Sequence, residues 1–325
     1  MPAGAAITIR PLAESDIDAV RPLIVRDPAS ALSGESFLDK LAARQYRPEW
    51  TWLAVDDASD APLAVAVWWG ASAQDHPGAL DAILVAESVP GADRVELVAA
   101  VLRAGQEAFA AGEDRRLPDY HVFVPGDWRE RPEVVEALAW RTAAAARAGL
   151  TERLERLRYE WIVEGAEPPE PSERLTFHAE PDDEVFVGLF ARVLESSLDH
   201  TSVTEAAAVG AEAQARSDVE FYRDVMLGER SWWRIAKDAE GRTVGFGFPS
   251  RNPGAHVVGY LGVLPEFRGN GYVGDILDEI LRILVVEVGA TMVRADTDLA
   301  NVPMATAMER AGFLNFARRL VYSAP

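Results

Sequence analysis

The same order of predicted elements occurs twice along the chain, and this repeat strongly limits the folds that the chain can adopt. Each half has an opening strand, an acidic helix start, a hairpin, a buried strand, a long helix, another strand and a last helix. The buried strands are expected at 82–85 and 258–263. The last helices end alike, at 147–150 (RAGL) and 310–313 (RAGF), where glycine supplies the C-cap. The repeat predicts an α+β protein made of two copies of one fold.

A segment rich in proline and acidic residues, 164–173, separates the two halves. Such a segment has little apolar surface to bury and is typical of a linker. We therefore expect one domain over residues 1–164, a linker over 165–173 and a second domain over 174–325. The length of 325 residues suits two domains. A monomer and a homodimer both remain open.

The composition excludes several kinds of site and partner. The chain has no cysteine, which excludes disulfides, thiolate metal sites and a cysteine nucleophile, and no metal site is expected. Its formal charge of −20 repels nucleic acids and mildly favours cationic amines, although solubility alone is the simpler interpretation. No window approaches the roughly 20 apolar residues of a membrane span. The opening residues lack the features of a signal peptide, so we expect a cytoplasmic protein without a membrane partner.

A glycine-rich turn, Arg268-Gly269-Asn270-Gly271-Tyr272-Val273-Gly274, carries the clearest chemical signal. An apolar strand stops at Pro265, and a helix with an apolar face begins near Gly271. Unpaired N–H groups at a helix N-terminus bind phosphate oxygens, and glycines let the backbone approach closely and adopt positive φ. Arg268 can add a charge-assisted hydrogen bond. The turn therefore predicts a pyrophosphate site.

Two other interpretations of this turn have to be weighed. Gly269-x-Gly271-x-x-Gly274 matches the dinucleotide fingerprint, and Asp296 stands at about the right distance for its acidic residue. However, too few residues follow Gly274 to complete a doubly wound sheet, and the preceding strand follows a hairpin. A plain strand–turn–helix connection would not require an arginine immediately before paired glycines.

The pattern Val263-x-Pro265-x-x-Arg268-Gly269-x-Gly271, followed by Asn301 and the sequence AGF at 311–313, resembles the GNAT (Gcn5-related) N-acetyltransferases. The resemblance covers the second half well, and the first half only by its element order and endings. It implies two tandem GNAT-like domains, each with a mixed, mostly antiparallel sheet flanked by helices. It also implies an enzyme that uses acetyl-CoA or another acyl-CoA as co-substrate and transfers the acyl group to a small-molecule amine by direct attack on the thioester.

The resemblance further assigns roles to residues. Backbone N–H groups from Arg268 to Gly274 (Arg268, Gly269, Asn270, Gly271, Tyr272, Val273 and Gly274) would hold the coenzyme A pyrophosphate. Leu261 and Val263 would offer strand backbone to the pantetheine arm, and an N–H of that strand would polarise the thioester carbonyl. Asn301 would contact the cofactor near the thiol, or cap the helix after it, or both.

Some positions depart from the family pattern. Val273 stands where the family usually has Gly or Ala, and Met308 stands where many members carry a tyrosine that protonates the thiolate. Residues 259–262 contain no carboxylate for a general base, which leaves Tyr260, Asp296 and Asp298 as catalytic candidates. The two aspartates could instead belong to a turn over 296–301. The missing acid motivates an alternative function, a non-catalytic acyl-CoA sensor.

The first half lacks the same turn. Pro90-Gly91-Ala92-Asp93 stands where Arg268-Gly269-Asn270-Gly271 stands, so the arginine is missing and a carboxylate replaces the second glycine. Repulsion between that carboxylate and a pyrophosphate is unfavourable. We expect the first copy to bind no coenzyme A.

Overall fold

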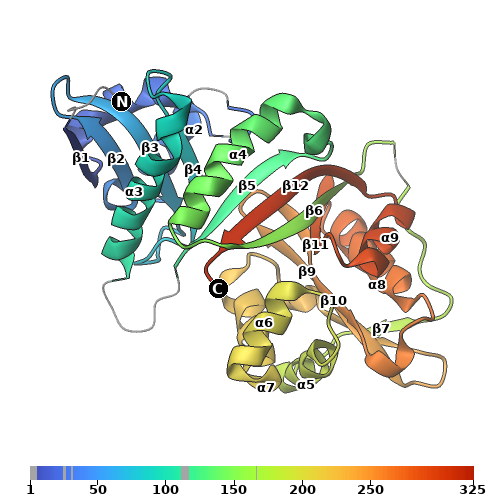
Figure 1. The fold of residues 1–325 in the computed structure, drawn as a ribbon. Helices are drawn as coiled ribbons and strands as arrows, with labels where there is room; N and C mark the ends of the chain where they lie inside the picture. The colour runs from blue at the N-terminus through green and yellow to red at the C-terminus, as the bar shows by residue number, and fades with distance from the viewer. Residues whose placement is uncertain (1–5, 25–26, 31, 111–116, 166) are drawn as a thin grey trace. The chain divides into compact units, whose positions relative to one another are not determined.

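A computed structural model describes residues 6–24, 27–30, 32–110, 117–165 and 167–325. The chain divides into two compact units, one made of residues 1–155 with 317–325 and the other of residues 156–316 (Figure 1).

The first unit is a mixed sheet with helices on both faces. Its strands have the order β1-β2-β3-β4-β5-β12, and neighbours run antiparallel except for the parallel pair β4–β5. The strands are β1 Ile7–Pro11, β2 Thr51–Asp56, β3 Ala61–Trp69, β4 Ala79–Val85, β5 Asp119–Pro125 and β12 Leu314–Ser323. The helices are α1 Ile17–Val20, α2 Gly34–Ala42, α3 Gly91–Phe109 and α4 Pro132–Arg147.

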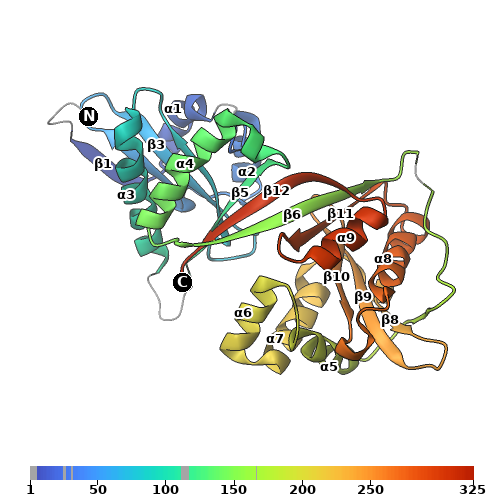
Figure 2. The same ribbon diagram turned by 45° about the vertical axis from the view of Figure 1, so that its right-hand side comes forward.

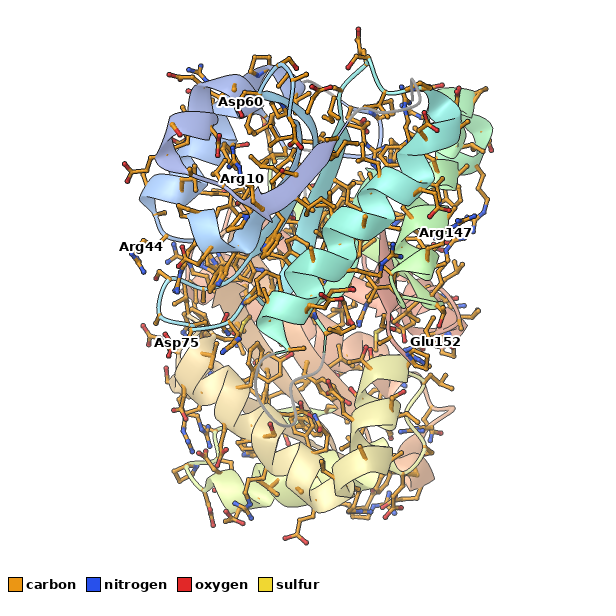
Figure 3. The ribbon with its side chains drawn as sticks, turned by 60° about the vertical axis from the view of Figure 1, so that its left-hand side comes forward. Arg10, Arg44, Asp60, Asp75, Arg147 and Glu152 are labelled. Atoms are coloured by element: carbon orange, nitrogen blue, oxygen red, sulfur yellow. The ribbon has the colours of Figure 1, made fainter. Side chains whose placement is uncertain are left out.

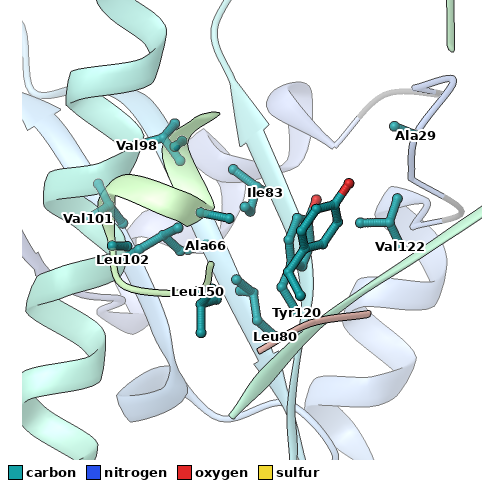
Figure 4. Close-up of a cluster of buried hydrophobic side chains, with 14 of the residues drawn as sticks. Ala29, Ala66, Leu80, Ile83, Val98, Val101, Leu102, Tyr120, Val122 and Leu150 are labelled. Carbon is teal, nitrogen blue, oxygen red and sulfur yellow. The ribbon is translucent and has the colours of Figure 1, made fainter. Parts of the chain in front are cut away.

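The alternation of side chains along these strands creates two apolar layers in the first unit. One layer joins the sheet to α3 and α4, and Figure 4 shows Leu80 and Ile83 of β4 beside Val101 and Leu102 of α3. The other layer packs against α1 and α2. Exposed charged side chains such as Arg44, Asp75 and Glu152 cover the outside of this unit (Figure 3).

The second unit repeats this arrangement. Its strands have the order β6-β11-β10-β9-β8-β7, again antiparallel except for one parallel pair, β10–β11. The strands are β6 Glu152–Ile162, β7 Thr176–His178, β8 Arg234–Lys237, β9 Thr243–Asn252, β10 Ala255–Val263 and β11 Met292–Asp298. The helices are α5 Asp183–Leu194, α6 His200–Val209, α7 Ala211–Glu220, α8 Tyr272–Arg282 and α9 Val302–Arg310.

The side chains of β9 explain how helices cover both faces of this second sheet. Phe246 and Phe248 point to one face and pack against Phe186 and Phe190 of α5. Gly245 and Gly247 point to the other face, where α8 approaches closely. A Cβ atom at Gly245 would collide with the backbone oxygen of Gly262 in β10 and lie 2.8 Å from Cδ1 of Ile276, so only glycine fits between β10 and α8 at this position.

The predicted fold class is confirmed, because both units are α+β with mixed, mostly antiparallel sheets flanked by helices. The division of the chain differs from the expected boundaries at 164 and 174. Residues 156–162 of β6 pair with β11 in the second unit, and residues 317–322 of β12 pair with β5 in the first (Figures 1 and 2). The two halves of the sequence therefore exchange their last strands. Local periodicity identifies a strand but not its partner, which is why the exchange was not expected.

Among the described residues, the structure contains no helix long and apolar enough to cross a membrane.

The strand exchange predicts that residues 1–164 do not form a stable monomer when produced alone. That fragment lacks β12, so β5 keeps an open edge and Tyr120 loses its stacking partner Tyr322 at 5.7 Å. We expect aggregation or non-cooperative unfolding in light scattering and urea denaturation. The control is the full chain cut within 165–173, which keeps both exchanged strands and should unfold like the intact chain. A monomeric fragment with cooperative unfolding would contradict the exchange.

Candidate active site

A cavity of about 860 Å³ lies within the second unit. Its wall is formed by β10, the glycine-rich turn, the end of β11, α9 and the region of α6 and α7. Most of the residues predicted for the site line it. These are Tyr260, Leu261, Val263, Arg268, Gly269, Gly271, Tyr272, Val273, Asp296 and Asn301, whereas Asn270, Gly274 and Asp298 do not line it.

The cavity opens where two parallel strands separate. β10 pairs with β11 only at His256–Val293 and Val257–Arg294, and a bulge follows between Val258 and Tyr260. The N–H of Leu264 donates to Val244 of β9 at 2.9 Å. Since backbone groups alternate in direction along a strand, those of Leu261 and Val263 face away from β9, toward the side that β11 has left. The strand therefore presents backbone hydrogen-bonding groups to the cavity.

The glycine-rich turn presents a group of backbone N–H donors. Gly269 and Gly271 have φ of 80° and 77°, a conformation that other residues rarely adopt, and Gly271 is the N-cap of α8. Within the described chain, no acceptor takes the N–H groups of residues 269–273. The N–H groups at the two ends of the predicted segment are already used: Arg268 donates to Pro265 at 3.3 Å and Gly274 to Gly271 at 3.0 Å.

The side chain of Arg268 has a different role from the expected one. Its guanidinium donates to the backbone oxygens of Ser196 (2.6 Å), Val193 (3.3 Å) and Val263 (3.1 Å) and to Oγ of Ser196 (2.8 Å). These bonds place the positive charge of Arg268 at the C-terminal end of α5, where carbonyl groups lack helical partners. Arg268 thus attaches the turn to α5 and to the end of β10.

The end of the linker fixes the turn from the other side. Arg174 forms an ion pair with Asp275 in the first turn of α8 and donates to the carbonyl of Asn270 at 2.9 Å. Ser172 donates to Asp275 at 2.6 Å. The turn is therefore held in place before any ligand binds.

The three catalytic candidates are placed differently. Tyr260 and Asp296 line the cavity, and Nε of Arg158 lies 3.4 Å from Oδ1 of Asp296. Burial raises the pKa of Tyr260, so its hydroxyl keeps its proton at neutral pH and is unsuited to act as a base.

The side chain of Asp298 is buried and serves the structure. Its Oδ2 accepts the N–H of His200 at 2.6 Å, and its Oδ1 lies 3.3 Å from Nε of Arg156. β11 continues through Asp298, so Asp296 and Asp298 stand opposite Arg158 and Arg156 of β6. The expected turn over 296–301 begins only after this strand. Asp298 ties β11 and β6 to the start of α6 and has no place in the cavity wall.

Asn301, at the start of α9, and Met308, within α9, both lie in the cavity wall. The side chain of Asn301 accepts the N–H of Met304 at 3.3 Å, which shows the helix-cap role. The position that would carry an acidic hydroxyl is filled by the apolar Met308, only 2% exposed.

The sequence did not reveal the polar wall contributed by α6, α7 and the segment after them. Glu205, Gln214, Asp218 and Tyr222 line the cavity there. The hydroxyl of Tyr222 donates to the carbonyl of Gly259 in the β10 bulge at 2.6 Å. Residues 199–220 are rich in alanine and charged side chains and carry no motif that would indicate a site, and Asp199 caps α6.

In the first unit the corresponding gap between strands is filled. β4 pairs with β5 only at Ala79–Asp119 and Leu80–Tyr120. The guanidinium of Arg141, 1% exposed, donates to the carbonyl of Ile83 at 3.1 and 3.2 Å and to Asp27 at 2.7 Å. Ile83 occupies the place in β4 that Leu261 occupies in β10. The backbone that lines a cavity in the second unit is therefore already occupied in the first.

Comparison with known proteins identifies the second unit. Residues 174–314 match the acetyltransferase (GNAT) domain family. This unit belongs to the GNAT acetyltransferase superfamily. No curated protein matches the chain with significant sequence similarity.

Solved structures resemble the whole chain in fold. A GCN5-related N-acetyltransferase from Sphaerobacter thermophilus is 16% identical, with 97% of this chain and 94% of that chain covered and a TM-score of 0.53. A glucosamine N-acetyltransferase region of a fungal multi-domain β-N-acetylglucosaminidase is 14% identical, with 99% and 38% covered and a TM-score of 0.56. A conserved protein of unknown function from Staphylococcus epidermidis is 12% identical, with 80% and 91% covered and a TM-score of 0.51. At these identities the likeness concerns the fold alone.

Replacing Arg268 by alanine should lower the free energy of unfolding of this GNAT domain by about 1–3 kcal/mol, because several carbonyl groups lose a charged donor. Urea denaturation of both proteins measures the difference. Arg192→Ala is the matched control, since it removes an exposed arginine of α5 that pairs with Glu266, and such pairs contribute about 0–1 kcal/mol. Equal effects of the two substitutions would show that Arg268 does not hold the turn.

Proposed function

We propose that the second unit is an acyl-CoA-dependent N-acyltransferase that transfers an acyl group, most simply acetyl, to a small amine. The observation that carries this proposal is the set of free N–H groups at 269–273, at the N-terminus of α8 and beside the open backbone edge of β10. Donors that converge at a helix N-terminus fit phosphate oxygens. An unpaired strand edge fits the amide groups of a pantetheine arm.

The same geometry supports direct transfer. With the pyrophosphate at the turn, the thioester would lie along β10, and a backbone N–H of Leu261 or Val263 would polarise its carbonyl. The neutral amine nitrogen attacks the carbonyl carbon and forms the new C–N bond, the nitrogen loses a proton to solvent, and the C–S bond breaks as the thiolate leaves. Met308 cannot supply a proton to that thiolate. Thiols are acidic enough, with a pKa of about 8.5 for cysteine, to leave without one.

Binding should depend on Gly271. Gly271→Glu places a carboxylate beside the phosphate-binding N–H groups, so we expect the affinity for acetyl-CoA to fall at least about tenfold in isothermal titration calorimetry. Gly289→Glu is the matched control, because Gly289 is also exposed, has φ of 78° and lies outside the cavity wall. Gly289→Glu adds the same negative charge and also forces a non-glycine residue into a positive φ, so the two variants differ only in their distance from the proposed phosphate site. Equal losses in the two variants, or none in Gly271→Glu, would place the cofactor elsewhere.

The wild-type titration should saturate at one acetyl-CoA per chain, because Arg141 occupies the equivalent backbone in the first unit. Binding of two acetyl-CoA molecules per chain would contradict the inference that Arg141 blocks the first unit.

A panel of amines, with thiol release as the readout, then tests transfer. Saturable binding without thiol release for any amine would favour the sensor over the enzyme.

A further inference from the structure

The α6–α7 wall of the cavity contains a carboxylate that no basic side chain of the described residues neutralises. Oδ1 of Asp218 on α7 accepts a hydrogen bond from Gln214 at 3.0 Å. Its Oδ2 is shielded from solvent and has no hydrogen-bond partner among the described residues. Within the same residues, Asp218 forms no ion pair with a basic side chain. An ionised carboxylate is unfavourable in such a place unless a ligand compensates it.

The groups that face Asp218 make this end of the cavity negative. Glu205 of α6 shares the amide of Gln214 at 3.0 Å, and Asp199 stands at the N-cap of α6. The nearby cation, Arg156 of β6, is engaged with Asp199 at 3.1 Å and with Asp298 at 3.3 Å. Tyr222 and Tyr260 complete the surroundings, and burial raises the pKa of both hydroxyls.

These surroundings also change the acidity of Asp218. Burial, with the charges of Glu205 and Asp199, raises its pKa to about 6. At neutral pH the carboxylate is mostly ionised, and it is more basic than an exposed aspartate. A base with a pKa near the working pH is efficient in proton transfer.

Asp218 is close in structure to the strand that would carry the thioester. Tyr222, four residues after Asp218, donates to the carbonyl of Gly259, which lies two residues before Leu261 on β10. Figures 1 and 2 show α5, α6 and α7 together beside β9 and β10. The carboxylate and the open strand edge line one cavity.

We propose that the acyl acceptor binds between α7 and β10 as a protonated amine, and that Asp218 receives its ammonium group and accepts its proton. This inference rests on the proposed function. One proton passes from the ammonium nitrogen to Asp218, the freed lone pair forms the C–N bond, the nitrogen loses its second proton to solvent, and the C–S bond breaks to release the thiolate. The protonated Asp218 then returns its proton to solvent or to the departing thiolate, which restores the carboxylate.

The same wall specifies the class of amine. The carboxylates of Asp199, Glu205 and Asp218 repel any negatively charged group on the acceptor. The side chains of Leu198, Phe221 and Tyr222 offer apolar surface to the rest of it. An amine with an apolar body and no carboxylate fits this wall, and an amino acid does not. We therefore expect 2-phenylethylamine to be acetylated with a kcat/KM at least about tenfold higher than phenylalanine, because the two probes differ only in the carboxylate.

The pH dependence of the wild-type enzyme tests the role of Asp218 first. Only the ionised carboxylate accepts a proton, so kcat/KM should fall as the pH drops through about 6. Asp218→Asn should lower kcat by roughly 100-fold or more, remove this acid limb and leave acetyl-CoA affinity unchanged. Glu220→Gln, an exposed carboxylate on the same helix, makes the same charge change and should leave the rate and the limb unchanged.

The possible results separate this inference from the proposed function. An unchanged kcat in Asp218→Asn, a wild-type profile without an acid limb near pH 6, or preference for phenylalanine would each overturn the inference. Failure of the wild-type protein to bind acetyl-CoA would instead overturn the proposed function. If Asp218→Asn does not fold, Asp218→Glu decides, because it must retain the acid limb and part of the rate.

Discussion

The separation of β10 from β11 after two residue pairs is the feature on which the rest of the second unit depends. If β10 and β11 stayed paired, the backbone groups of Leu261 and Val263 would form hydrogen bonds with β11, and no space would remain between the two strands. The bulge at Gly259 begins the separation, and Tyr222 takes the carbonyl that the bulge exposes. The cavity and the open strand edge both follow from this local loss of pairing. The first unit has the same separation and fills it with Arg141.

Because the last strands are exchanged, β6 from the first half of the sequence contributes residues to the site in the second unit. β6 carries Arg156 and Arg158 opposite Asp298 and Asp296, so opposite charges meet directly across the two strands. Arg156 also holds Asp199 at the start of α6. These contacts connect the sheet to the helices that form the acidic wall. The geometry of that wall therefore relies on a strand that a linear division of the chain would assign to the other domain.

The sequence was sufficient for the repeat, the fold class and the glycine-rich turn, because these depend on local spacing and on positive φ at Gly269 and Gly271. It was not sufficient for features that depend on distant partners. The guanidinium of Arg268 donates to the carbonyl groups of Val193 and Ser196 at the end of α5, and Asp298 is buried by contacts with β6 and α6. Asp218 lies on a polar helix with no motif, and only the folded chain brings it to β10. The strand exchange also depends on pairing between residues far apart in the sequence. Hydrophobic periodicity identifies a strand but does not indicate its partner.

In the complex proposed for the second unit, one acyl-CoA lies along β10 with its pyrophosphate at the N-terminus of α8. Amide hydrogen exchange of the full chain, with and without saturating acetyl-CoA, tests this most directly, because N–H groups that gain an acceptor exchange more slowly. Acetyl-CoA at this place should slow exchange over residues 261–273 and leave exchange over 83–93 unchanged. Unchanged exchange over 261–273 at saturation, or protection centred on 83–93, would contradict it.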